Sequence, residues 1–515
     1  MSTGGHAGYA DYAAAAHDGM SIAFAAARDP DRIAVYSEYG DRSYGELNAN
    51  TNRIVRALRA AGVAYGDRVA LLCRNRAEFA EVASATARGG FWLTAVNWHL
   101  TPDEVNYVVE DSESKALFID ASIPGADGVA AIASAPLLVS IAGKLPRCTQ
   151  YDDLLAGVDG SDIVDPRRGS TMLYTSGTTG RPKGVYRERV APPGPNITGY
   201  DETSKHLVTG PLYHAAPLLL SLYPPLTWGA SVVMMDGWSP EDTLRLIEEH
   251  AITHSHMVPT MFNRLNQLPD DVKATADTSS LRIVLHGAAP CPVPVKQAML
   301  DWWGPIIWEY YAATEGSATL VDPHTWLTHP GTVGKPAADD GVIIRDDDGN
   351  ECPRGTPGTV WIKTIPGGEF EYYNDTKKTA ETVVDTHFSL GDVGYLDDEG
   401  FLYLTDRTAN LIISGGVNIY PAEVDAVLIQ HPAVGDVAVI GVPDDDMGES
   451  VKAVVELRAG VEPSDDLAAE IIAFARERIA KFKCPRTVDF VGRLPREDNG
   501  KIYKRRLREQ YRANA

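Results

Sequence analysis

The stretch that decides the fold is Tyr174-Thr-Ser-Gly-Thr-Thr-Gly-Arg-Pro-Lys-Gly-Val185. Its glycines let the backbone approach an anion closely, and its serine and threonine hydroxyls can donate hydrogen bonds to phosphate oxygens. Lys183 adds a positive charge. The stretch is not a Walker loop, because no Gly-Lys-Ser/Thr follows at the required spacing. It therefore predicts a phosphate-binding loop of another kind.

The bulk composition is that of an ordinary globular enzyme. The chain has 515 residues, of which 44% are hydrophobic and 23% are charged. This length is enough for two to four domains of roughly 100–200 residues each. The formal net charge of -23 disfavours binding to nucleic acids or to anionic membranes, since the mean field of the protein repels phosphate. A phosphate ligand must therefore be held by a local site.

The spacing of the cysteines and the hydropathy of the chain indicate the cellular compartment in which the protein is expected. The five cysteines lie far apart and form no Cys-x-x-Cys pair, so neither a disulfide framework nor a zinc site is predicted. The first twenty residues lack a basic start followed by an apolar segment, and no apolar run approaches the roughly 20 residues that span a bilayer. We expect a cytoplasmic protein with no nucleic-acid partner and no stable membrane insertion.

The first four-fifths of the chain alternate between short apolar runs and helical patterns. Residues 69–73 form such a run, and a helical pattern follows through Ala87. Helix starts are indicated at Thr101-Pro102-Asp103-Glu104 and at Ser239-Pro240-Glu241-Asp242, where a hydroxyl cap precedes proline and acids. This alternation predicts an α/β domain of parallel sheets covered by helices.

The pattern changes twice toward the C-terminus. From about residue 341 to 408 it becomes a series of short β-like segments with turns, which predicts a β-rich subdomain. From residue 409 to 515 it reads as α+β. We therefore predict a large N-terminal domain over residues 1–408 and a small C-terminal domain over residues 409–515.

The phosphate-binding stretch resembles that of the adenylate-forming superfamily, which includes acyl-CoA synthetases, peptide-synthetase adenylation domains and luciferases. The resemblance covers nearly the whole chain, because further motifs follow in the order found in that family. They are Gly287-Ala-Ala-Pro290, Tyr310-Tyr-Ala-Ala-Thr-Glu315, Gly391-Asp392, Asp406-Arg407, Ile413-Ser-Gly-Gly-Val-Asn-Ile-Tyr-Pro-Ala-Glu423 and Asn499-Gly-Lys501.

The resemblance implies a fold, a reaction and its co-substrates. The C-terminal domain would be mobile, and the active site would lie between the two domains. A carboxylic acid attacks the α-phosphate of Mg²⁺-bound ATP to give acyl-AMP and pyrophosphate, and the thiol of coenzyme A then displaces AMP. Negative charge builds on the phosphates as pyrophosphate leaves, which is why donors and a cation are needed there.

The resemblance also implies roles for individual residues. Tyr310 is placed in the nucleotide site, Tyr311 stacks on adenine, Glu309 lies near its amino group, and Glu315 helps to hold Mg²⁺. The remaining nucleotide-binding residues grip the triphosphate, lie along adenine or contact the ribose: Thr175, Ser176, Gly177, Thr178, Thr179, Lys183, Gly287, Ala288, Ala289, Thr314, Asp392 and Arg407.

Three further assignments concern the C-terminal domain. Lys501 matches the family's catalytic lysine, and Ser414, Gly415 and Gly416 match the loop that lines the tunnel for coenzyme A. Ala409 stands where the family's hinge is usually Asp or Lys. We hypothesise that this change leaves adenylation robust and makes thioester formation slower or dependent on a partner.

The acid is predicted from the residues around the acyl group. Tyr213-His214 resembles the motif whose aromatic residue guards the acyl pocket, with His214 near the reacting carboxylate. The following residues 215–220 are all apolar, so burying an unpaired ammonium there would cost several kcal/mol. The resemblance places His256, Ala312 and Ala313 beside the same pocket. An uncharged tail is predicted.

Small side chains at these positions resemble the subset that acts on bulky bile-acid, steroid or diterpenoid carboxylates. A medium- or long-chain fatty acid and an aryl acid are open alternatives.

Other functions compete with that of an acyl-CoA ligase. An adenylation-only enzyme that passes acyl-AMP to a partner is an alternative, and a homodimer or a partner acyltransferase is left open. A non-catalytic nucleotide-binding regulator would have lost Lys501, Glu315 or Lys183, and all three are present.

Overall fold

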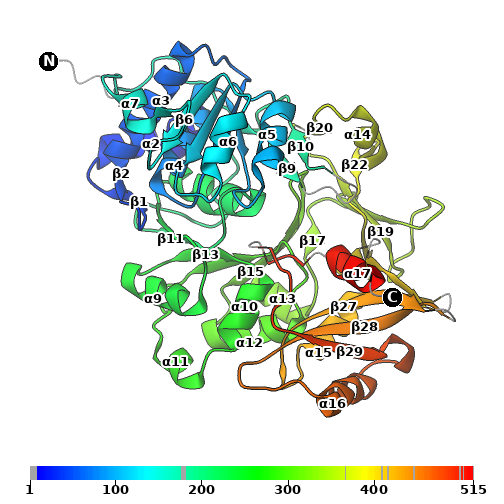
Figure 1. Ribbon diagram of the computed structural model, residues 1–515. Helices are drawn as coiled ribbons and strands as arrows, with labels where there is room; N and C mark the ends of the chain where they lie inside the picture. The colour runs from blue at the N-terminus through cyan, green and yellow to red at the C-terminus, as the bar shows by residue number, and fades with distance from the viewer. Residues whose placement is uncertain are drawn as a thin grey trace.

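The computed structural model describes residues 9–175, 181–365, 367–407, 410–414, 417–444, 447–497, 500–502 and 504–513, without the side chains of 505, 512 and 513. These residues form five sheets. Figure 1 shows two sheets in the N-terminal half, a β-rich part to one side, and a smaller C-terminal lobe coloured orange to red.

The first sheet is parallel throughout, in the order β7-β6-β5-β3-β4-β8. Its strands are β3 (Arg68–Leu72), β4 (Trp92–Ala95), β5 (Ala116–Asp120), β6 (Leu137–Ile141), β7 (Thr149–Gln150) and β8 (Ser170–Thr171). Its helices are α3 (Tyr44–Ala60), α4 (Ala77–Gly89), α5 (Pro102–Asp111), α6 (Ala126–Ile132) and α7 (Tyr151–Leu155).

Alternating side chains of β3 explain why helices cover both faces of this sheet. Leu71 packs with Ile54 of α3 and Phe79 of α4, whereas Leu72 belongs to the cluster that contains Val105 of α5 and Val129 of α6. Successive side chains of a strand point to opposite faces, so a continuous apolar strand needs a helix layer on each side.

The second sheet has the order β17-β16-β15-β14-β13-β11-β12-β1-β2, and its pairs from β15 to β1 are parallel. Its strands are β1 (Ile33–Tyr36), β2 (Arg42–Ser43), β11 (Lys205–Val208), β12 (Ser231–Met234), β13 (His254–Met257), β14 (Ile283–His286), β15 (Ile307–Ala312), β16 (Ser317–Val321) and β17 (Lys335–Pro336).

The helical segments associated with this half of the chain are α1 (Tyr12–His17), α2 (Ser21–Arg28), the π-helix η1 (Pro217–Leu222), α8 (Tyr223–Thr227), α9 (Pro240–His250), α10 (Pro259–Asn266), α11 (Asp270–Thr275), α12 (Val293–Trp303) and α13 (Pro323–Thr328).

Two further sheets follow the first two in the large domain. One is β20-β10-β9, in which β9 (Leu173–Thr175) and β10 (Lys183–Tyr186) are antiparallel and β20 (Glu371–Tyr372) pairs with β10. The other forms the β-rich part, with helix α14 (Thr376–Thr382) nearby. Its strands are β18 (Val342–Arg345), β19 (Gly358–Lys363), β21 (Val383–Val384), β22 (His387–Phe388), β23 (Asp392–Leu396) and β24 (Leu402–Arg407).

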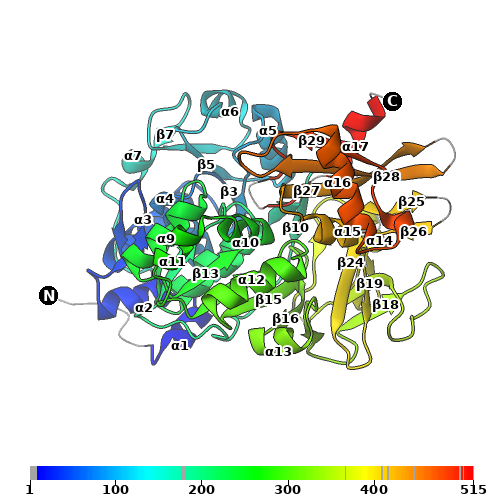
Figure 2. The same cartoon turned by 90° about the horizontal axis from the view of Figure 1, so that it is seen from below.

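The C-terminal lobe is built on a sheet of order β26-β25-β28-β27, to which β29 adds beside β28. Its elements are β25 (Ile412–Ser414), β26 (Val417–Ile419), α15 (Pro421–Leu428), β27 (Val434–Asp444), β28 (Gly448–Leu457), α16 (Asp465–Arg476), η3 (Lys481–Lys483), β29 (Thr487–Val491) and α17 (Lys504–Ala513). In both views β27 and α15 lie beside α10 of the large domain (Figures 1 and 2).

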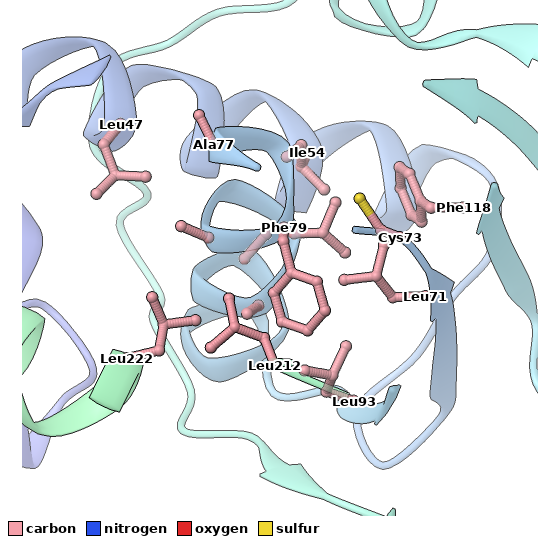
Figure 3. Close-up of a cluster of buried hydrophobic side chains, with 14 of the residues drawn as sticks. Leu47, Ile54, Leu71, Cys73, Ala77, Phe79, Leu93, Phe118, Leu212 and Leu222 are labelled. Carbon is pink, nitrogen blue, oxygen red and sulfur yellow. The ribbon is translucent and has the colours of Figure 1, made fainter. Parts of the chain in front are cut away.

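Figure 3 shows the buried hydrophobic cluster of the first sheet, which holds the π-helix η1 next to the candidate acyl pocket. Phe79 lies among Leu71, Leu93 and Leu212, and Leu222 of the π-helix belongs to the same buried cluster. π-Helical turns are rare and frequently occur at functional sites. The core therefore fixes the position of η1.

The predicted fold class is confirmed: a large α/β domain with a β-rich part is followed by a small α+β domain. Both predicted helix starts hold. Thr101 forms a capping box with Glu104 at α5, and the Ser239 side chain accepts from the Asp242 amide at α9. The boundary predicted at 408/409 falls on residues that the structure does not describe. Within the described ranges, each helix is too short or too polar to cross a bilayer.

Candidate active site

A carboxylate at the start of β23 joins two parts of the molecule. Asp392 Oδ2 accepts a hydrogen bond of 2.6 Å from the Tyr311 hydroxyl of β15, and Oδ1 accepts one of 2.8 Å from Arg407 Nε. The register of β23 and β24 pairs Asp392 with Arg407. Burial and the Asp392 charge raise the pKa of Tyr311, so its phenol keeps the proton that it donates. This cluster contains three predicted nucleotide-binding residues.

Lys501 of the C-terminal lobe reaches the same cluster. Three charged groups of the large domain act on it, namely Arg407, Asp392 and Glu315, together with Glu497 of its own lobe. Burial and the neighbouring Arg407 charge lower the pKa of Lys501, although part of its surface stays exposed. Figure 1 shows the red segment before α17 running from the C-terminal lobe toward β15. The structure thus brings the predicted catalytic lysine to the predicted ribose site.

Glu315 is buried in a tight turn at the end of β15. The turn is closed by the Ala313 amide, which donates to the Gly316 carbonyl at 2.7 Å, and Tyr372 donates to Glu315 Oε1 at 2.8 Å. Arg187 donates to the backbone carbonyls of Thr314 and Glu315 at 2.8 and 2.7 Å. These contacts fix one carboxylate oxygen and orient the turn that carries Thr314.

The strands that flank the predicted phosphate loop, β9 and β10, pair in an antiparallel hairpin. Thr175 of β9 pairs with Lys183 of β10. Lys183 Nζ lies 2.6 Å from Asp375 Oδ2, and both side chains are partly exposed. The loop therefore begins and ends at one place, with a lysine at its base. Ser176, Gly177, Thr178 and Thr179 lie outside the described residues.

The segment predicted to lie along adenine follows β14 in a strained conformation. Ala288 has a φ of 67°, a left-handed value that is uncommon for a residue with a side chain. A Cβ on Gly287 would lie 2.6 Å from the Tyr310 carbonyl oxygen, so only glycine fits there. Ala289 follows directly in the chain. Backbone strain of this kind tends to persist at ligand sites.

Behind this segment lies a buried group of charged and polar side chains. Glu309 Oε2 lies 2.7 Å from Lys296 Nζ of α12 and 3.3 Å from His286 Nε2 of β14, and all three side chains are buried. Burial alone would raise the pKa of Glu309, but His286 and Lys296 hold it below its ordinary value. The role of Glu309 at the adenine amino group stays a prediction.

The predicted acyl side is lined by neutral groups. His256 Nε2 and the Tyr310 hydroxyl are 2.8 Å apart, and burial lowers the pKa of His256 to about 3. The rings of Tyr213 and His214 lie 4.5 Å apart between centroids, immediately before the π-helix. Ala312 ends β15, and Ala313 opens the turn to Glu315. A neutral histidine offers no positive charge for a second carboxylate.

The residues assigned to the coenzyme A tunnel are described only in part. Ser414 ends β25, is buried, and pairs with Gly448 of β28 and Val417 of β26. Gly415, Gly416 and the hinge residue Ala409 lie outside the described residues, so their predicted roles stay predictions.

Comparison with known protein families shows the family to which this chain belongs. The family model described as AMP-binding enzyme matches residues 22–367, and the AMP-binding enzyme C-terminal domain matches residues 423–501. The chain belongs to the AMP-binding enzyme family. This assignment confirms the predicted enzyme class, an AMP-forming acyl-CoA synthetase.

Individual relatives of this AMP-binding enzyme differ in their acids. It is 34% identical over 477 residues to a feruloyl-CoA synthase from Amycolatopsis, covering 91% of this chain and 94% of the relative. It is 31% identical to the fatty acid–[acyl-carrier-protein] ligase ScoC from Streptomyces coeruleorubidus, covering 96% of each chain. Its structure matches o-succinylbenzoate CoA synthetase from Bacillus subtilis, solved with its acyl-adenylate, with a TM-score of 0.76, 29% identity, and coverage of 95% and 97%.

The bulky-acid expectation gains no support from these relatives, whose names refer to feruloyl, fatty acyl and succinylbenzoyl groups. Small side chains at positions such as Ala312 and Ala313 were the feature of the sequence that indicated a bulky acid. Small side chains leave room in a site but do not specify what fills it.

The structure of the AMP-binding enzyme adds contacts that no motif indicated. Tyr372 reaches Glu315 from 57 positions away in the sequence, and Asp375 reaches Lys183 from 192 positions away. Neither residue lies in a string with a recognisable spacing. Such pairs depend on how β10, β15 and β20 meet, so the sequence held no usable signal for them.

The lowered pKa of Lys501 gives a pH prediction. The protonated amine is the form that offsets negative charge on an adenylate, so adenylation should fall as the pH rises through this pKa. The fall should begin below the range of an ordinary lysine, which titrates near about 10.4. The measurement is the pH profile of acid-dependent pyrophosphate release at saturating ATP.

Arg407→Gln provides the comparison for that profile. It removes a positive charge that lowers the pKa of Lys501, so the alkaline limb should move to higher pH even if the rate drops. A limb at the same pH in both proteins would contradict the role of Lys501 as the titrating group.

Proposed function

We propose that the enzyme activates an aromatic or aliphatic carboxylic acid with an uncharged tail as acyl-AMP and transfers the acyl group to coenzyme A. The observation that carries the proposal is the convergence of Asp392, Arg407 and Glu315 on Lys501 from the other lobe. An adenylation site requires a carboxylate that can bind the ribose hydroxyls, a buried acidic residue and a lysine, all in one place.

In the first step the carboxylate oxygen of the acid attacks the α-phosphorus of ATP. The bond from that phosphorus to the α,β-bridging oxygen breaks, and pyrophosphate leaves with that oxygen. Preorganised donors stabilise the charge that develops on the phosphates. We assign this work to the hairpin that carries Lys183 and to Lys501. The positive charge of Lys501 offsets the negative charge of the reacting carboxylate and phosphate.

Magnesium fits the acidic residue of this site. Mg²⁺ prefers oxygen ligands, and Glu315 presents a buried carboxylate whose Oε1 is oriented by the Tyr372 hydroxyl. Glu315 would therefore hold the ion together with oxygens of the triphosphate. When bound, Mg²⁺ neutralises part of the triphosphate charge.

In the second step the thiolate of coenzyme A attacks the carbonyl carbon of acyl-AMP and AMP leaves. We assign Ser414 and the neighbouring glycines to the path of the pantetheine arm. His214, beside Tyr213 and the π-helix, is assigned to the reacting carboxyl group. The nature of the tail follows from His256, which is neutral above a pH of about 3 and so favours an uncharged group.

The proposed substrates are aryl acids of the ferulic or benzoic type and medium- or long-chain fatty acids. The names of the relatives support these classes, and the apolar residues 215–220 agree with both. Tyr310 and His256 also present a neutral hydrogen-bonding pair, which favours an aryl acid that carries a hydroxyl group.

The test is an acid-dependent pyrophosphate-release screen over aryl, fatty, bile-type and diterpenoid acids, each with and without coenzyme A. We expect AMP and pyrophosphate with aryl or fatty acids, and a thioester only when coenzyme A is present. ADP and phosphate as products, or no response to any acid, would contradict the proposal.

The same screen tests the hinge hypothesis. With Ala409 at the hinge, single-turnover pyrophosphate release should be faster than acyl-CoA formation. Equal rates would remove that hypothesis without affecting the adenylation chemistry.

A further inference from the structure

Helix α10 carries two different faces. Met261, Phe262 and Leu265 are buried in the second core cluster of the large domain. Thr260, Asn263 and the C-cap residue Gln267 have the spacing i, i+3, i+7, which places them together on another side of the helix. This polar stripe faces the C-terminal lobe.

Each residue of the stripe donates a hydrogen bond to that lobe. Asn263 Nδ2 and Gln267 Nε2 both donate to the Gly435 carbonyl oxygen, at 2.8 Å each, and Thr260 Oγ1 donates to the Gly500 carbonyl oxygen at 3.2 Å. A carbonyl oxygen has two lone pairs and can accept both amide donors. Gly435 lies in β27, and Gly500 directly precedes Lys501.

The two contact points on the C-terminal lobe are themselves connected. Asp436, next to Gly435, holds Arg496 through two bonds of 2.5 and 2.7 Å, and Arg496 Nη1 donates to the Gly500 carbonyl at 2.8 Å. Such paired bonds between a guanidinium and a carboxylate fix orientation as well as distance. The start of β27 and the segment Gly500-Lys501, called the lysine loop below, therefore dock on α10 as one unit.

The lobe approaches the large domain closely at Gly500. Gly500 has a φ of 77°, and a Cβ there would lie 2.8 Å from Val258 Cγ2 and 2.9 Å from Thr260 Oγ1. The lysine loop thus packs directly against the start of α10. In this structure the stripe makes its contacts while Lys501 is held at the Asp392 cluster.

We propose that Thr260, Asn263 and Gln267 are positioning residues that hold the C-terminal lobe in the state that forms acyl-AMP, and so set the balance between the two half-reactions. This inference rests on the proposed two-step function. Hydrogen bonds between neutral groups contribute modestly, so the docking holds Lys501 in place and still releases the lobe for thioester formation.

The experiment replaces both amides in the full-length chain, as Asn263→Ala with Gln267→Ala. Alanine keeps the helix and removes only the donors. Loss of two such bonds should lower the rate of pyrophosphate release without coenzyme A by about tenfold. Thioester formation from supplied acyl-AMP and coenzyme A should stay equal to wild type or rise.

Gln297→Ala is the matched control. Its amide lies on α12 and donates a hydrogen bond of 2.8 Å to the exposed Asp301 of the same helix. Both half-reactions should keep wild-type rates in this variant. Equal losses in both half-reactions of the double variant, or no loss in either, would overturn the proposal. The single variants Asn263→Ala and Gln267→Ala provide the same comparison if the double variant folds poorly.

Hydrogen exchange gives a second readout that needs no substrate. Peptides covering 431–437 and 494–497 should exchange faster in the double variant than in wild type, and peptides of the first sheet should not change. Unchanged exchange in the docking peptides would also overturn the proposal. If wild type makes no adenylate from any acid, the proposed two-step function is wrong. The hydrogen-exchange measurement then still tests whether the polar stripe of α10 holds the C-terminal lobe.

Discussion

Lys501→Ala is expected to lower the rate of acyl-AMP formation by about 10²–10³-fold, the usual cost of removing one group that stabilises developing charge. Lys501 is the charged side chain that the C-terminal lobe brings to Asp392, Arg407 and Glu315. ATP binding should persist, because the ribose carboxylate and the phosphate hairpin belong to the large domain. The measurement is acid-dependent pyrophosphate release together with equilibrium binding of ATP.

Lys481→Ala separates this effect from a general loss of charge. Lys481 is an exposed lysine of the same lobe, in η3, and its replacement should leave both half-reactions unchanged. Wild-type pyrophosphate release in Lys501→Ala would remove the assigned role. So would a loss of ATP binding as large as the loss of rate.

Glu309→Gln is expected to destabilise the large domain by about 3 kcal/mol, because it leaves a buried positive charge without its counter-ion. Lys296 is fully buried and lies 2.7 Å from Glu309 Oε2. The nearby His286 cannot replace the lost negative charge. Urea unfolding monitored by tryptophan fluorescence, with the transition of the large domain resolved from that of the small one, is the measurement.

The double variant Glu309→Gln with Lys296→Met tests the cause. Removing both charges should recover much of the stability, because no buried charge is left without a partner. Asp301→Asn, at an exposed carboxylate of the same helix, should have little effect. A double variant less stable than the single one would show that the ion pair is not the source of the loss.

The Glu309 effect should also depend on pH. The pKa of Glu309 is lowered in the folded state, so its contribution is present above the pKa of the unfolded carboxylate, about 4.3. It is lost as the pH falls through the lower folded value. The difference between wild type and Glu309→Gln should therefore shrink in acid.

Local patterns in the sequence predicted the features that depend on neighbouring residues. The caps at Thr101 and Ser239 are made within four residues, and the alternation of apolar runs predicted the parallel sheets. The strings containing Asp392 and Arg407 were predicted to share one site, and their side chains are in direct contact. Both kinds of prediction need only short-range chemistry or an ordered motif.

Partners brought together by the fold were beyond the reach of such patterns. Nothing near Glu309 indicates that Lys296 lies beneath it, and nothing near Lys183 indicates Asp375. The polar stripe of α10 resembles any solvent-facing helix side until β27 and the lysine loop are placed against it. The choice of acid is likewise set by packing, so small side chains alone gave an expectation that the relatives do not support.

The most direct test of the account is a crystal structure with a non-hydrolysable acyl-sulfamoyl adenosine. We expect the ribose hydroxyls to bind Asp392, the sulfamate to lie within reach of Lys501, and the acyl group to pass between His214 and His256. An adenosine bound away from Asp392, or a sulfamate that contacts neither Lys501 nor the Lys183 hairpin, would contradict it.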